Sequence, residues 1–440
     1  MIRPFSHSMR SGLRVVCVEM PHLHAAELAV YVKVGGRNDP PGKTGVSHFL
    51  EHMLFRGTSD FASSLEIDNA FAAIGGAPNA ATDAESTCYY SRVHPDHVRR
   101  GMEIFASMLL RSHLEGIDIE KRIILEEARE DLNESGIEIC PDTIASRMLW
   151  PRHPLGLPTI GTHESIASMT HCDLEKHLET YYRPNQAVLV VSGPVRSHDV
   201  FAHAEDVFGA WQAGSIPPTL PVAACGRKPQ ICCVEDSDSQ MSLQIAFLAI
   251  PRGDKRCHAL RVVRRILAGG GSSRLYLKLR EELGIIYSVE ASIGSYDETG
   301  CFSIDLSTAP DTLEQAIEAT LAELLRIAVE HIPSAELERV IQSYIYDLEY
   351  SRDSAFEMGG RYGWGELMGV VRSIEEDQQA ARTLTADDIL GIARIVCAPQ
   401  NLRMVAVGPW KRGMKGRVRK LVQRYEGRFQ EVEKQVDNCG

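Results

Sequence analysis

The sequence predicts an α+β protein made of two tandem homologous domains, each an antiparallel sheet packed with helices. The main observation is an internal repeat, in which residues of similar character recur 215 positions later in one register along the chain. Strand-like and turn-like positions both keep this register: Leu28/Leu243, Val30/Ile245, Val32/Phe247, Arg37/Arg252, Pro184/Pro399, Val190/Val405, Gly193/Gly408 and Pro194/Pro409. The second observation is the composition, with 44% hydrophobic and 24% charged residues, which is typical of globular proteins.

The two predicted domains are separated by a stretch rich in Gly and Pro. Residues 212–229 contain two Gly and four Pro, a pattern typical of a linker. We therefore predict a domain over residues 1–211, a linker over 212–229 and a homologous domain over 230–440.

Apolar patterns predict the elements of the first half in order. Residues 13–18, 26–34 and 187–193 are rich in β-branched and apolar residues and are expected to be strands. Residues 46–56, 65–71 and 117–130 have helical spacing of apolar positions without internal Pro or Gly.

Charge and cysteine content limit the classes of function. A formal net charge of −12 argues against nucleic acid as the main partner. No apolar run is long enough to span a bilayer, and the first ten residues lack the apolar core of a secretory signal. Eleven Cys without a C-x-x-C pair favour reduced thiols, so a cytoplasmic protein without membrane contact is expected.

The strongest candidate site is the segment His48-Phe49-Leu50-Glu51-His52. On a helix, residues four apart lie on one face, so both imidazoles can point at one metal ion. Glu51 lies close enough to reach a water molecule at that ion. This is H-x-x-E-H, the inverted form of the zinc-protease motif H-E-x-x-H. Two histidines on an apolar helix are also compatible with plain core packing.

A catalytic zinc site typically has three protein ligands, so a third ligand is expected elsewhere. The acidic helix over residues 117–130 is the best candidate region, with Glu120 and Glu127 on one stripe that continues to Asp131. Glu126 and Glu130 lie on a neighbouring face with Arg129. Periodicity alone gives Glu127 only a modest advantage.

The chain resembles the pitrilysin family of zinc peptidases, the inverzincins, which includes insulin-degrading enzyme and mitochondrial processing peptidase. In that family a glutamate ligand follows the motif by about 75 residues and is preceded by another glutamate seven residues earlier. Glu127 lies 75 residues after His52 and seven after Glu120. The resemblance implies that His48, His52 and Glu127 bind one Zn2+ per chain, that Glu51 is the catalytic base and that Glu120 supports the site.

The same resemblance assigns further residues. Asn79 and Ala80 match the start of the family stretch N-A-x-T-x-x-E-x-T-x-Y and would hold an extended peptide at a sheet edge; otherwise Asn79 caps a turn. Arg280 and Tyr287, by themselves a surface residue and a strand residue, match an Arg/Tyr pair that contacts the substrate carbonyl in that family.

The second half is expected to lack the metal site. The repeat places Val263, Ile266, Leu267 and Gln342 at the positions of His48, Glu51, His52 and Glu127. Residues 269–274 are rich in Gly but lack the G-K-[ST] ending of a phosphate-binding loop, so nucleotide binding is not expected.

The expected function is that of a zinc endopeptidase acting on unfolded or leader peptides in a closed chamber. Relatives of this length work as paired chains, so a homodimer is favoured over a heterodimer with an inactive homologous subunit. Two alternatives stay open: a non-catalytic peptide-binding or scaffold subunit, and a metal-dependent hydrolase of non-peptide substrates.

Overall fold

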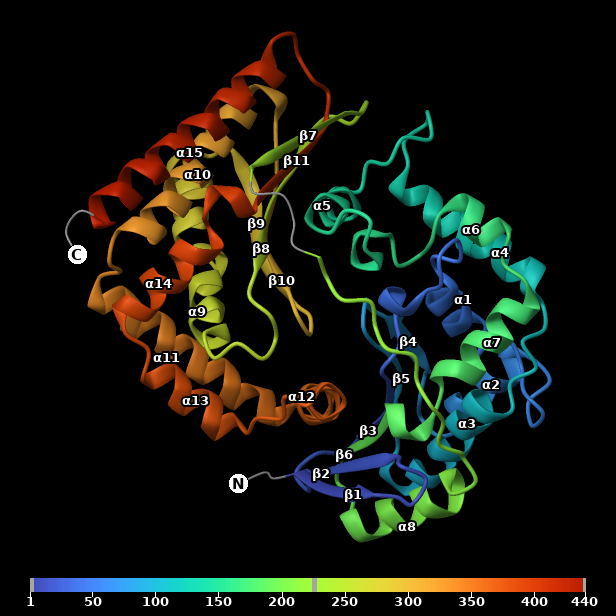
Figure 1. Ribbon diagram of the computed structural model, residues 1–440. Coiled ribbons are helices and arrows are strands. Elements are labelled where there is room, and N and C mark those ends of the chain that lie inside the picture. Colours follow the sequence, from blue (N-terminus) through green and yellow to red (C-terminus); the bar gives the residue numbers. More distant parts are fainter. Residues whose placement is uncertain (1–3, 224–227, 438–440) are drawn as a thin grey trace. The chain divides into compact units, whose positions relative to one another are not determined.

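The computed structural model describes residues 4–223 and 228–437 (Figure 1). The described chain forms two compact units, and each unit contains a segment from the opposite half of the sequence. Unit 1 consists of the described residues up to Glu130, Leu157–Leu220 and Leu348–Ile374; unit 2 consists of the rest. The predicted domain boundaries at residues 211 and 230 describe the sequence repeat and stay a prediction. Each compact unit also contains a segment from the other side of these boundaries.

Unit 1 contains a six-stranded sheet with the order β1-β2-β6-β3-β5-β4. Its strands are β1 (Pro4–Ser8), β2 (Arg14–Glu19), β3 (Ala26–Val32), β4 (Asn79–Thr82), β5 (Thr87–Val93) and β6 (Ala187–Gly193). The central strands β3 and β6 are buried along their whole length, which explains their near-continuous apolar sequences. β4 lies at the edge and alternates between exposed and half-buried residues.

Helices cover both faces of this sheet. Those of unit 1 are α1 (Val46–Met53), α2 (Ser64–Ala72), α3 (Val98–Leu110), α4 (Ile117–Glu127), α6 (His163–Ala167), α7 (His171–Tyr181), α8 (Ser197–Phe208) and α12 (Ala355–Met368). Gly101 of α3 packs on Leu28, whereas Gly363 of α12 packs on Tyr31. Since Leu28 and Tyr31 point to opposite faces of β3, α12, which belongs to the second half of the sequence, covers the face opposite α3.

Unit 2 contains a five-stranded sheet with the order β7-β11-β8-β10-β9. Its strands are β7 (Gln230–Glu235), β8 (Met241–Ala249), β9 (Ile286–Ser295), β10 (Gly300–Thr308) and β11 (Leu402–Gly408). Its helices are α5 (Pro141–Leu149), α9 (Cys257–Ala268), α10 (Leu313–Val329), α11 (Ser334–Tyr350, whose last turn joins unit 1), α13 (Ile374–Arg382), α14 (Ala386–Val396) and α15 (Met414–Asp437). α5, from the first half of the sequence, packs on β8 and β11.

The predicted fold class is confirmed, with two sheets that each pack against helices. One detail differs from the expected antiparallel sheets: β2 pairs with β6, and β7 with β11, in parallel. The remaining neighbours in both sheets are antiparallel. A parallel pair needs a long crossover, and most of each half of the chain lies between its two parallel strands.

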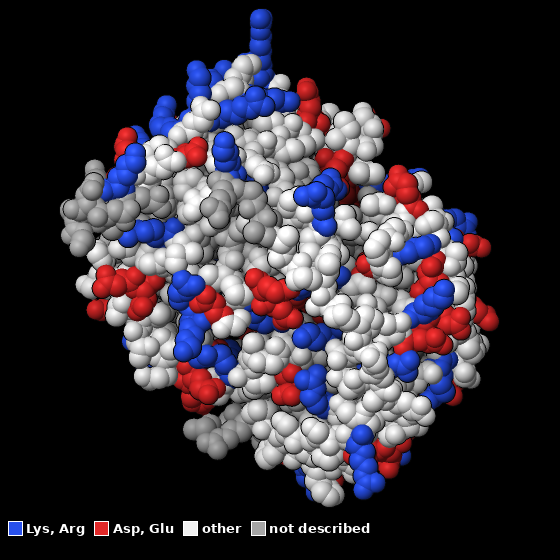
Figure 2. Space-filling model, viewed as in Figure 1, with Lys and Arg blue, Asp and Glu red and all other residues white. Residues whose placement is uncertain are grey.

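Charged side chains of both signs mix over most of the face seen in Figure 2, but Lys and Arg gather where α15 begins. Three cations on or just before α15 pair with acidic residues on or just before α10: Lys411 with Asp311, Arg417 with Glu314, and Arg424 with Glu318. Among the helices that the structure describes, none is both long and apolar enough to cross a membrane.

Candidate metal centre

Helix α1 carries the H-x-x-E-H motif with its apolar side turned into the core of unit 1. Val46, Phe49, Leu50 and Met53 are buried at i, i+3, i+4 and i+7, which leaves His48, Glu51 and His52 on the opposite side. The helix starts after Gly45, which has a φ of +89°. A Cβ added at this position would lie 2.5 Å from the carbonyl oxygen of Ile160, so only glycine fits there.

The first turn of α1 is fixed by a buried polar chain. Asp39 accepts hydrogen bonds from the backbone N–H of Gly45 at 2.6 Å and of Ser47 at 3.1 Å, and from the Ser47 hydroxyl at 2.6 Å. The Ser47 hydroxyl also lies 2.9 Å from Nε2 of His177 on α7. Because Ser47 gives its only proton to Asp39, Nε2 of His177 must be the donor of that contact. These hydrogen bonds connect Ser47, the residue before His48, to the neighbouring helix α7.

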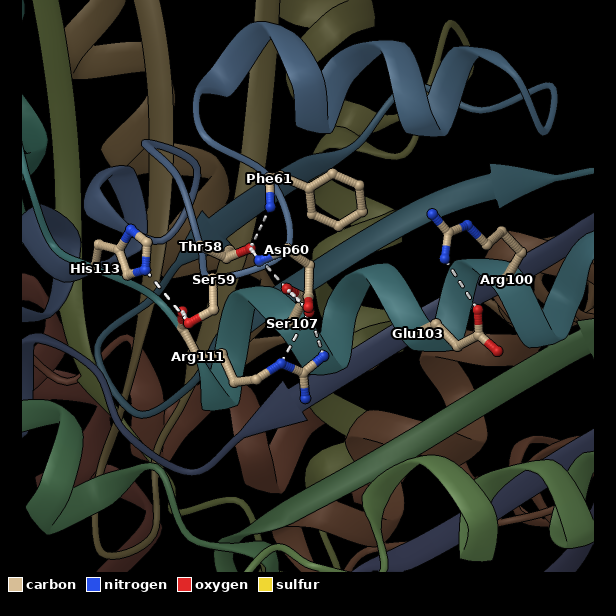
Figure 3. Close-up of polar contacts among 9 residues, drawn as sticks. All are labelled: Thr58, Ser59, Asp60, Phe61, Arg100, Glu103, Ser107, Arg111 and His113. Carbon is tan, nitrogen blue, oxygen red and sulfur yellow. Dashed lines mark hydrogen bonds and ion pairs between the residues drawn. The ribbon is translucent and has the colours of Figure 1, made fainter.

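The segment after α1 is fixed as well, by the network in Figure 3. Asp60 accepts hydrogen bonds from Arg111, at 2.6 Å and 2.9 Å, and from Ser107 of α3 at 2.7 Å. Thr58 lies 2.7 Å from the Ser107 hydroxyl. The first turn of the motif helix and the loop that follows the helix are therefore both anchored to other helices by polar contacts, in addition to the apolar packing of the helix.

Helix α4 brings the third candidate ligand to the two histidines. The carboxylate oxygens of Glu127 lie 3.8 Å from Nε2 of His48 and 3.8 Å from Nε2 of His52. One donor atom from each of the three residues lies within 4.8 Å of the others. The side chain of Glu127 is 46% exposed, whereas Ile124 is fully buried and fixes the helix. The structure thus brings together the residues that were separated by 75 positions in sequence.

The three donors fit a divalent zinc ion. Two imidazole nitrogens and one carboxylate oxygen are a common catalytic zinc set. Ligand atoms about 2.1 Å from a tetrahedral ion are about 3.4 Å apart, and the Glu127 oxygens lie 3.8 Å from each imidazole nitrogen. Burial, together with the neighbouring His52, lowers the pKa of His48 to about 4, so its ring is neutral near pH 7. Nδ1 of His48 is buried and has no hydrogen-bond partner among the described residues. The other ring nitrogen, Nε2, is the atom that faces Glu127.

Glu120 supports His52 from the same helix as Glu127. Its carboxylate lies 3.2 Å from Nδ1 of His52 and 3.2 Å from Arg56, and the residue is only 4% exposed. Burial disfavours the charged ring of His52, but the hydrogen bond to Glu120 and the nearby carboxylates outweigh this and raise its pKa. A carboxylate on the second nitrogen of a histidine fixes the tautomer that leaves the other nitrogen for a metal.

Glu51 is nearly buried and stays outside the ligand set. The residue is 8% exposed, and its carboxylate accepts a hydrogen bond from the hydroxyl of Thr82 at the end of β4. Burial raises the pKa of Glu51, and the Thr82 hydrogen bond opposes that change. A buried carboxylate with a raised pKa beside a metal position is suited to proton transfer.

Asn79 and Ala80 lie on β4, which pairs with β5 and forms an edge of the sheet. Asn79 is exposed, and its side-chain oxygen accepts a hydrogen bond from the N–H of Ala80 at 2.8 Å. This contact is compatible with both interpretations of Asn79, as a cap and as part of a peptide-binding edge. The side chain occupies a backbone donor that an incoming strand could use. The role of both residues toward a peptide stays a prediction.

Arg280 and Tyr287 lie together in unit 2. The guanidinium of Arg280 lies 5.2 Å from the ring centre of Tyr287 and 4.9 Å from that of Tyr276. Tyr287 is 81% exposed at the start of the edge strand β9. Their role toward a substrate stays a prediction.

The positions equivalent to the motif in unit 2 are apolar and packed. Val263, Ile266 and Leu267 of α9 are each at most 1% exposed. Among the described residues, the group on α1 and α4 is the only candidate cluster of three metal ligands.

Sequence reasoning missed the contacts that hold the site. Thr82 falls on the first threonine of the family stretch N-A-x-T-x-x-E-x-T-x-Y but was given no role, and Asp39, Ser47 and His177 were not singled out. The available signal was weak: Ser47 precedes the first motif histidine, but its partners come from a turn and from a helix 130 residues away.

The two-unit fold and the His/His/Glu set with an adjacent glutamate are together typical of zinc metallopeptidases. Two family models match the chain: "Insulinase (Peptidase family M16)" over residues 14–163 and "Peptidase M16 inactive domain" over residues 168–344. The chain belongs to the M16, or pitrilysin, family of zinc metallopeptidases.

Similar proteins agree with this family. The uncharacterized zinc protease YmxG of Bacillus subtilis is 29% identical over 396 residues, covering 88% of this chain and 94% of the relative. An uncharacterized zinc protease of Mycobacterium tuberculosis is 29% identical over 401 residues, covering 89% and 90%. A protease from Helicobacter pylori has the same fold, with a TM-score of 0.85 at 22% identity, covering 93% of this chain and all of that chain.

Proposed function

We propose that this chain is a zinc-dependent endopeptidase that hydrolyses peptide bonds in unfolded or leader peptides. The observation that carries the proposal is the convergence of His48, His52 and Glu127, with Glu51 beside them but outside the donor set. His48 and His52 would offer their Nε2 atoms and Glu127 its carboxylate to one ion per chain.

A zinc ion held there supplies Lewis acidity, which makes water easier to deprotonate and polarises a carbonyl group. Glu51 then takes the proton from the attacking water, and the protonated carboxyl passes it to the nitrogen of the leaving amine. Glu120 keeps the His52 ring in the tautomer that directs Nε2 toward the ligand group.

We propose that the substrate binds as an extended peptide, which adds to the free edge of β4 beside Asn79 and Ala80. Backbone pairing of this kind is tolerant of side-chain sequence, and β4 contacts the motif helix α1. The family resemblance further assigns Arg280 and Tyr287 as hydrogen-bond donors to the carbonyl oxygen that becomes negative. We also infer a cytoplasmic protein that pairs with a second homologous chain, most simply as a homodimer enclosing a chamber.

The test replaces Glu51 with Gln, which keeps the size of the side chain and removes the base. We expect the variant to keep its zinc and to lose peptidase activity by a factor on the order of 10² or more. Zinc is measured by elemental analysis and cleavage by mass spectrometry of a digested peptide mixture.

Unchanged activity in a zinc-loaded Glu51→Gln protein would remove the mechanism. A wild-type chain with neither zinc nor cleavage of any unfolded peptide would favour the scaffold alternative. Cleavage of small amides but not of peptides would favour a different hydrolase.

A further inference from the structure

We propose that Thr82 is a positioning residue, which holds the carboxylate of Glu51 from the strand to which the substrate would add. This inference rests on the proposed function. It assigns to the Thr82 hydroxyl the task of orienting the base relative to the bound peptide.

The position of Thr82 follows from the register of the edge strand. β4 pairs with β5 so that Thr82 lies opposite Thr87 and Ala80 lies opposite Tyr89. Since side chains alternate along a strand, Ala80 and Thr82 point to one face, and Asn79 and Ala81 to the other. The face of Thr82 is the one turned to α1, because its hydroxyl donates to Oε2 of Glu51.

This hydrogen bond is the only one to the Glu51 carboxylate among the described residues. A glutamate side chain has several rotatable bonds, and Glu51 lies directly beside the candidate ligand His52. Without a donor on Oε2, the carboxylate could turn toward the ligand group and compete for the ion. With the donor in place, Oε2 is occupied and the other oxygen is left for a water molecule.

The same contact links substrate binding to the base. Thr82 ends a strand of only four residues, whose other edge would receive the peptide backbone. A peptide that pairs with β4 is therefore held by the same strand that orients Glu51. Proton transfer depends strongly on such alignment, so removal of the contact should lower the rate of the chemical step more than substrate affinity.

A purely structural role for Thr82 makes different predictions. Thr is a good strand former, and its loss could simply loosen β4. In that case stability and KM would change, and the presence of the hydroxyl itself would not matter.

The experiment uses two matched pairs of the full chain that differ in the hydroxyl: wild type against Thr82→Val, and Thr82→Ser against Thr82→Ala. We expect Thr82→Val and Thr82→Ala to lose about 10- to 100-fold in kcat, with KM changed less than about threefold. Thr82→Ser should stay within about threefold of wild type, because it keeps the donor. Zinc content and the thermal midpoint are measured for every variant.

Equal kcat within both pairs would overturn the inference, and so would a loss in Thr82→Ser as large as in Thr82→Ala. If the valine variant does not fold, the Ser/Ala pair decides alone. Glu51→Gln is run in parallel: an active Glu51→Gln removes the proposed function, whereas an inactive Glu51→Gln together with a fully active Thr82→Val removes only the role of Thr82.

Discussion

At the scale of single residues, the two motif histidines have opposite electrostatic environments although they lie one turn apart. Burial lowers the pKa of His48, whereas the hydrogen bond to Glu120 and the nearby carboxylates outweigh burial and raise the pKa of His52. Protons should therefore compete with a metal mainly at His52. Burial also lowers the pKa of His177, which contacts Ser47, the residue before His48.

His177 should make the protein sensitive to mild acid. Burial lowers the pKa of its ring from 6.5 to about 3, so below pH 6.5 the unfolded chain binds a proton that the folded chain does not. The contribution of His177 to stability is complete above pH 6.5 and is lost as the pH falls toward 3. Each pH unit in this window should cost about 1.4 kcal/mol.

The measurement is urea unfolding of the metal-free protein at about pH 7.5 and about pH 5.5, for wild type and for His177→Gln. Gln keeps an N–H donor for Ser47 but does not titrate. Its stability should fall less between the two pH values than that of wild type. An identical fall in both proteins would contradict the assignment.

At the scale of elements, the position of α12 depends on two glycines one turn apart. A Cβ at Gly363 would overlap Cγ2 of Val190 and lie 2.9 Å from the ring of Tyr31, and a Cβ at Gly359 would lie 2.7 Å from the Ser192 hydroxyl. These glycines let the helix backbone lie directly on β3 and β6. Gly360, between them, would meet only the hydroxyl of Tyr31, at 3.7 Å.

Two alanine substitutions on this helix should therefore have opposite effects. Gly363→Ala should lower the free energy of unfolding by about 1–3 kcal/mol through steric overlap. Gly360→Ala should raise it by about 0.5–1 kcal/mol, because Ala favours the helix where space is available. Chemical denaturation of both variants checks this, and equal effects would show that α12 does not pack closely at Gly363.

At the scale of the whole molecule, the chain exchanges helices between its two halves. α12 covers a sheet built from the first half, and α5 packs on a sheet built from the second half. Each half of the repeat by itself therefore lacks a helix that covers its own sheet. Cooperative folding should require both halves.

Separate expression of residues 1–211 and 230–440 tests this dependence. Each fragment alone should bind a hydrophobic dye and unfold without a sharp transition, because one face of its sheet loses apolar cover. Co-expression should restore a cooperative transition and zinc binding. A cooperatively folded first fragment with bound zinc would contradict the importance of the exchange.

Much of the fold could be predicted from the sequence, because periodicity and repetition are local or regular signals. The repeat of 215 positions indicated two similar domains, and the apolar runs of β3 and β6 indicated strands. The helix exchange could not be predicted, since the pattern of an amphipathic helix states which face is apolar but not which sheet receives it. The parallel pairs β2–β6 and β7–β11 were missed because the apolar pattern of a strand does not state which strand it pairs with or in which direction.

The sequence by itself determined the ligand types and their spacing, because the four-residue period of a helix places His48 and His52 on one face wherever that helix lies. Glu127 was one acid among several until the family resemblance selected it, and only the tertiary structure decided that its carboxylate lies beside both imidazoles. Only the tertiary structure also decided that Thr82, Asp39 and His177 touch the motif helix. Such contacts join distant segments through packing, and no local pattern in the chain encodes them.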